Sequence, residues 1–267
     1  RCLVDHRCFG LMAIRPADHG VVSGSAAGFT PITATGGTIS DVGDYRYHKF
    51  ISSGTFEITA NPETSTVEVN ILAGASGADT RQGGGGGEWL ALTGQTGAVD
   101  TYPIVIGAGG GSGGGGVDSS AYGTTATAGY WCGSYKGMCC GNGNVGGQNT
   151  TAGGNGGGGM GAVGGVAYGE SNVNGGAGGA GLSHAVWTGV SLTSPGPGGG
   201  GGAGQWGASG GSGGYYQGGN GATTADGNGT NGVANTGGGG GGSGNYGGSA
   251  GLGGSGMVVL RYTLVAA

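Results

Sequence analysis

Short apolar runs, one of them clearly alternating with polar residues, lie between residues 45 and 110 and again at 257–265. TVEVNILAG (residues 66–74) sets Val67, Val69 and Ile71 against polar neighbours, the period of two expected of a half-buried strand. No window joins helical apolar spacing to helix caps, so we predict an all-β fold with essentially no α-helix. Further strand candidates are YRYHKFI (45–51), TFEITA (55–60), EWLALTG (88–94), YPIVIGAGG (102–110) and MVVLRYTLV (257–265).

The pattern divides the chain into a lead, a β framework and a glycine-rich insertion. Residues 1–33 are weakly patterned, residues 34–107 read as ordinary β protein, and 257–267 return to β character. We predict that the last run rejoins the sheet of the earlier runs, a small antiparallel sheet or sandwich. Residues 108–256 are then an insertion closed at its base.

Composition decides how the insertion can fold. Gly is 80 of 267 residues, and there is no sustained Gly-X-Y register, which excludes collagen. Glycine chains in the polyproline-II conformation, with about three residues per turn, can approach closely enough to bond N–H to C=O between neighbours. We therefore predict a polyglycine-II helix bundle, its strands formed by runs such as 108–116, 153–159, 175–181, 197–204 and 237–244.

Charge and hydropathy exclude several partners. Charged residues are 8% of the chain and the net charge is −5, without the basic stripe of a nucleic-acid-binding protein. No apolar run is long enough to cross a membrane. The first residues lack the pattern of a signal peptide, and Met12 is a candidate start. An extracellular protein with this beginning fits a virion component released by lysis, and equally a fragment of a longer chain.

Catalytic and metal-binding patterns are weak. Gly-x-Gly-x-x-Gly matches are expected by chance at this glycine content, and none lies in a βαβ unit. The four histidines are scattered, and the Cys2–Cys8 spacing is unlike that of zinc sites. We expect no enzyme activity, no cofactor and no metal.

The candidate binding residues lie in connectors between glycine runs. Trp and Tyr offer rigid contact area with a polar handle, and a bundle filled with glycine leaves them no interior pocket. YWCGSYKGMCC (130–140) is either a receptor loop or a chain reversal packed on its neighbours, and Cys132 could pair with Cys139 or Cys140. The candidate receptor contacts are Tyr130, Trp131, Tyr135, Lys136, Trp187, Trp206, Tyr215 and Tyr216.

The series YHKFISSGTFEIT, VEVNILAGASG, YPIVIGAGGGSGGGG and GGSGMVVLRY resembles a glycine-rich domain of phage tail-fibre and other surface proteins. The resemblance covers residues 34–263. The glycine tract is also similar to the polyglycine-II tip adhesins of T-even-like phage long tail fibres. It implies bundled polyglycine-II helices whose loops meet porins or sugars, although the connectors here do not align with those loops one to one.

We therefore expect a virion-associated receptor-binding protein of a phage tail fibre, extracellular and without catalysis. Its partners would be a bacterial outer-membrane protein or surface glycan, and other virion or fibre subunits. The alternative is a self-associating filament or virion decoration subunit. Ice binding by a flat Thr/Ala face is a third reading, which the large aromatic rings disfavour.

Overall fold

The chain has an all-β fold, in agreement with the alternating pattern. A computed structural model describes residues 28–131, 139–141, 143–148, 154–167, 174–182, 198–204, 210–214 and 217–266. Within these ranges there is no helix. The strands are β1 (Thr33–Thr35), β2 (Thr38–Val42), β3 (Tyr45–Phe50), β4 (Gly54–Ala60), β5 (Thr66–Leu72), β6 (Trp89–Thr96), β7 (Asp100–Ile104), β8 (Ser119–Ala121), β9 (Thr124–Ala126) and β10 (Met257–Thr263).

The strands form three antiparallel sheets. The largest has the order β2-β3-β10-β5-β6, a second has the order β1-β4-β7, and β8 and β9 form a hairpin. The C-terminal strand β10 lies between β3 and β5, pairing Leu260 with His48 on one side and with Val69 on the other. The prediction that the last run rejoins the early sheet is therefore confirmed.

One hydrophobic core holds the two larger sheets together as a sandwich. Val67, Val69 and Ile71 of β5 are fully buried, as their alternation predicts. They belong to the same cluster as Leu260 of β10 and Phe56 of β4, which reach the core from different sheets. Each buried aliphatic side chain of this size contributes about 2 kcal/mol, so this core anchors the framework.

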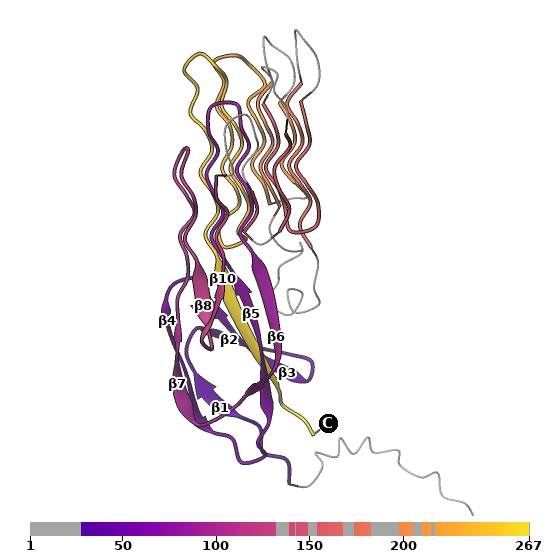
Figure 1. Cartoon of the computed structure of the whole chain (residues 1–267). Coiled ribbons are helices and arrows are strands. Elements are labelled where there is room, and N and C mark those ends of the chain that lie inside the picture. The colour runs from indigo at the N-terminus through magenta and orange to yellow at the C-terminus, as the bar shows by residue number, and fades with distance from the viewer. Residues whose placement is uncertain are drawn as a thin grey trace, which may run out of the picture.

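Several strands continue directly into extended glycine-rich segments, which we call threads. β5 runs into thread 73–79, β6 begins after thread 83–88, and β10 begins after thread 249–256. Figure 1 shows the threads side by side, projecting away from the sandwich and joined by turns at both ends. Further threads are 114–118, 154–160, 163–167, 174–182, 198–204, 210–214, 217–222, 228–233 and 237–244.

Backbone hydrogen bonds link the threads with a repeat of three residues. In thread 73–79, amides three residues apart donate to the same neighbouring thread, at N···O distances of 2.8–3.0 Å. Thread 198–204 repeats the pattern toward three neighbours of its own. The donors and acceptor threads of the first case are Ala73 and Ser76 to 83–88, Gly74 and Gly77 to 114–118, and Ala75 and Ala78 to 249–256.

Close approach of the threads explains why they consist so largely of glycine. A Cβ atom on Gly200 would overlap the carbonyl oxygen of Gly240, and one on Gly239 would overlap that of Gly84. Because such contacts involve backbone rather than flexible side chains, no neighbour can move aside cheaply. The buried amides find carbonyl partners across the same short gaps.

Candidate functional site

The described part of the loop 130–140 is closed at its base. Tyr130 and Cys139 exchange two backbone hydrogen bonds, N–H of Tyr130 to O of Cys139 at 3.1 Å and the reverse at 2.9 Å. The side chains of Tyr130 and Trp131 are exposed beside this bridge. The two rings therefore stand on a closed, hydrogen-bonded base.

The two adjacent cysteines of this loop differ in chemistry. Cys139 is disulfide-bonded, whereas Cys140 is a buried free thiol whose Sγ donates to the carbonyl of Gly87 at 3.3 Å. Burial raises the pKa of Cys140 to about 12, so this thiol is not a nucleophile at neutral pH. Of the two partners considered for Cys132, Cys140 is thus excluded, and Cys132 itself lies outside the described residues.

The other candidate receptor contacts lie outside the described residues. They are the aromatic and cationic residues Tyr135, Lys136, Trp187, Trp206, Tyr215 and Tyr216.

Three turns meet at the end of the threads away from the sandwich, and we call them the tip (Figure 1). They span residues 79–82, 224–227 and 245–248. In the first, Arg81 has a left-handed φ of 68°, and its N–H donates to Ser243 O at 2.8 Å. In the third, the N–H of Tyr246 donates to Ala225 O at 2.8 Å. The turns are thus tied to threads and to one another.

The tip presents exposed side chains of mixed chemistry. Tyr246 is 62% exposed, and Asp79, Thr80, Thr224 and Asp226 are exposed in the other two turns. A rigid backbone that carries an aromatic ring, hydroxyls and carboxylates matches the composition of recognition surfaces. Sequence reasoning missed the turn 79–82, although ADTRQ interrupts the glycine run there.

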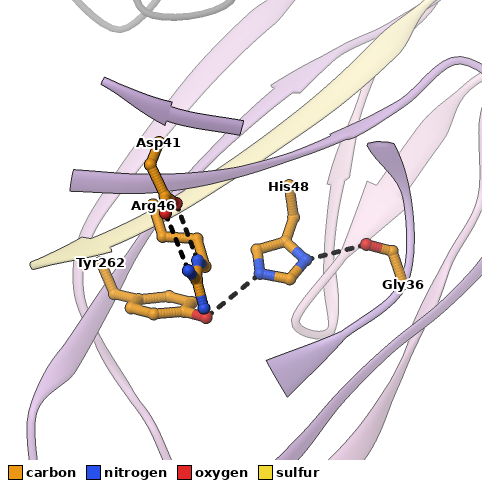
Figure 2. Close-up of polar contacts among 5 residues, drawn as sticks. All are labelled: Gly36, Asp41, Arg46, His48 and Tyr262. Carbon is orange, nitrogen blue, oxygen red and sulfur yellow. Dashed lines mark hydrogen bonds and ion pairs between the residues drawn. The ribbon is translucent and has the colours of Figure 1, made fainter. Parts of the chain in front are cut away.

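A buried polar cluster in the sandwich is the second arrangement of chemical groups. Figure 2 shows His48 of β3 between Gly36 and Tyr262 of β10. Nδ1–H of His48 donates to Gly36 O at 2.8 Å, which leaves Nε2 to accept from the Tyr262 hydroxyl at 3.2 Å. Burial lowers the pKa of His48 and raises that of Tyr262. Both side chains are closed off from solvent, so the cluster positions backbone and offers no substrate access.

The cluster holds the chain where it crosses between sheets. Gly36 and Gly37 join β1 to β2 with φ of 105° and 64°, values that L side chains rarely adopt. The bond from His48 fixes the Gly36 carbonyl at this crossing. Beside it, Arg46 donates to both carboxylate oxygens of Asp41 at 2.7 and 2.8 Å (Figure 2). The His48 cluster and the neighbouring Asp41–Arg46 pair therefore have a structural role.

Metal-binding clusters and membrane-spanning helices are both absent from the part of the chain that the structure describes. There, no three His, Cys, Asp or Glu side chains gather as they would around a metal ion. The described residues also contain no helix of the length and apolarity that crossing a membrane requires.

Comparison with known proteins places the chain at the level of a family. The model of a family described as a glycine-rich domain matches residues 51–263. The match begins just after β3 and extends through the threads to the end of β10, so it takes in the tip and the rest of the sandwich, whereas β1, β2 and β3 lie outside it. No curated protein matches the chain.

Proposed function

We propose that this chain, which belongs to the glycine-rich domain family, is a receptor-binding protein of a phage tail fibre. It acts without catalysis. Its threads form a polyglycine-II bundle, and the connectors of that bundle recognise a bacterial outer-membrane protein or surface glycan. Other fibre subunits hold it on the virion surface, outside the cell.

The polyglycine-II conformation is supported by the repeat of three. A helix with three residues per turn sends every third amide in the same direction. In thread 83–88, Gly83 and Gly86 donate to thread 154–160, and Gly84 and Gly87 donate to thread 237–244. Its carbonyls follow the same rule, because Gly85 O and Glu88 O, three residues apart, both accept from thread 73–79. An extended β-strand would alternate between two directions instead.

A binding role is supported by one observation above all, the preorganised tip. Its turns are tied by backbone bonds such as Gly244 N–H to Gly227 O at 2.9 Å, while side chains such as Tyr246 remain exposed. Preorganised loops lose little conformational entropy on binding. The tip also lies opposite the end at which the C-terminus leaves the sandwich (Figure 1). This polarity suits attachment at one end and contact at the other.

Whole-cell binding tests the proposal. Fluorescently labelled protein is titrated onto a panel of bacterial hosts, and competition with intact virions identifies the productive receptor. Two variants are compared with the wild type: Tyr246→Ala at the tip, and a combined Trp131→Ala, Tyr135→Ala, Trp187→Ala, Trp206→Ala variant. A central aromatic anchor contributes about 2 kcal/mol or more, so loss of one should weaken binding about thirtyfold.

The matched control is Ile39→Ala on β2. Ile39 is exposed like Tyr246, but it lies on the sandwich, away from the tip and the connectors. It should bind as the wild type does. Wild-type binding by both aromatic variants, each with an unchanged melting temperature, would reject recognition through these loops.

A further inference from the structure

Four threads succeed one another across one face of the bundle. Thread 217–222 pairs with 210–214 through Gly221 N–H to Gly211 O at 2.9 Å. Thread 228–233 pairs with thread 217–222 through Thr230 N–H to Asn220 O at 2.9 Å. It also pairs with thread 249–256 through Gly229 N–H to Ser249 O at 3.0 Å. We call this the Asn face.

On the Asn face, amides donate to side chains of the adjacent thread as well as to carbonyls. Asn220 and Thr230 are both exposed acceptors of this kind. The four bonds are Gly213 N–H to Asn220 Oδ1 at 2.8 Å, Asn220 N–H to Thr230 Oγ1 at 2.7 Å, Ser249 N–H to Asn228 Oδ1 at 2.7 Å, and Leu252 N–H to Asn231 Oδ1 at 2.8 Å.

The spacing of the asparagines matches the repeat of the threads. NGTNGV (residues 228–233) places Asn228 and Asn231 three residues apart, and the amides they accept, Ser249 and Leu252, are also three apart. Gly229 and Gly232, which follow the two asparagines, donate in return to the carbonyls of Ser249 and Leu252. The two threads are thus joined in both directions at each turn.

An unpaired row of backbone amides on such a face would act as an exposed sheet edge does, as a template for another chain. The hazard is greater here because Val233 and Leu252, each nearly half exposed, add apolar surface. A side-chain oxygen that accepts a hydrogen bond from such an amide makes the amide unavailable to another chain, while the thread stays extended. Soluble β proteins protect their edges by comparable means.

We propose that Asn220, Thr230, Asn228 and Asn231 seal the Asn face against the addition of a further glycine thread, which a second copy of this chain would supply. The seal limits the bundle to its own threads. It concerns a face along the bundle rather than the tip, and it holds whether or not the tip binds a receptor.

The test removes two of these side chains and measures self-association of the protein. The double variant Asn228→Gly, Asn231→Gly removes two acceptors and keeps the threads flat. The wild type should be a discrete species in analytical ultracentrifugation, and the variant should form larger species as concentration rises. Hydrogen exchange at the Ser249 and Leu252 amides should speed up about five- to tenfold, as expected for the loss of one hydrogen bond.

Asn245→Gly is the matched control. It makes the same replacement in a tip turn, where the described residues show no amide donating to the Asn245 side chain. It should neither associate nor change exchange at Leu252. If the double variant does not fold, Asn231→Ala, which leaves Ser249 capped, takes its place. Open-ended association of the wild type, or unchanged mass and exchange in the opened variant, would overturn the seal.

Discussion

At the residue scale, two adjacent residues near the C-terminus show how the alternation of side chains along a strand gives neighbours different roles. Arg261 and Tyr262 point to opposite faces of β10. Arg261 pairs with Glu68 at 2.7 Å and lies over the ring of Tyr45, with its guanidinium carbon 4.4 Å from the centroid. Tyr262 instead faces the core and donates to His48. The RY ending that the sequence singles out is therefore structural on both faces.

The His48 cluster predicts how stability depends on pH. In the unfolded chain His48 titrates near pH 6.5, and in the folded chain burial lowers its pKa. The unfolded state then takes up the proton first as the pH falls. Stability is fully present above about pH 6.5 and is lost as the pH falls through the folded pKa. Urea denaturation at pH 7 and pH 5 should show a smaller decline in His48→Gln, and equal declines would contradict this role.

A single thread glycine tests the close packing. Gly200→Ala should lower the free energy of unfolding by about 3 kcal/mol, because the new Cβ meets the backbone of thread 237–244. Gly111→Ala is the control: nothing lies within 4 Å of its Cβ position, so the change should stay within about 0.5 kcal/mol. Thermal melts of the two variants give the comparison. Equal melting temperatures would mean that the threads are not in close contact.

At the element scale, polar side chains accept hydrogen bonds from backbone amides at the junction between strands and threads. The carboxylate of Glu88 accepts from Thr127 N–H at 2.7 Å, that of Asp118 from Ala128 N–H at 2.7 Å, and the Ser119 hydroxyl from Gly107 N–H at 2.9 Å. These bonds lie where ladder pairing gives way to the three-direction pattern. A strand and the thread that continues it are thus one element that changes its bonding at a defined place.

At the scale of the whole molecule, the sandwich and the bundle should unfold together. Threads 73–79, 83–88 and 249–256 are continuous with β5, β6 and β10, so the sheet determines how the threads are aligned. Isolated glycine threads would lose too much conformational entropy to order alone. The bundle therefore depends on the core of the sandwich.

Hydrogen exchange on a core variant tests this dependence. Leu260→Ala, at a fully buried position of β10, should cost about 3 kcal/mol. Amides of thread 83–88 should then exchange about a hundredfold faster than in the wild type, although they lie outside the sandwich. Ile39→Ala on the exposed edge strand β2 should leave them unchanged. Unaltered exchange in Leu260→Ala would show that the bundle is independent of the sheet.

The sequence by itself determined the local elements. Alternation predicted β5, and composition and turn signals predicted β3, β4, β6 and β10, all close to their observed bounds. The return of the last run to the sheet was predicted despite its long separation in sequence. These succeed because a period of two and a buried face are properties of a few neighbouring residues. The sequence also offered Cys139 as a disulfide candidate, and the structure has that residue disulfide-bonded.

Only the tertiary structure decided which threads are neighbours. Glycine carries no side chain, so one run reads like another, and nothing local tells that 83–88 lies between 154–160 and 237–244. For the same reason the tip turn 79–82 and the pairing of Asn231 with Leu252 were not predicted. Backbone hydrogen bonds across long separations carry this information, because in the threads the main chain does the packing that side chains do elsewhere.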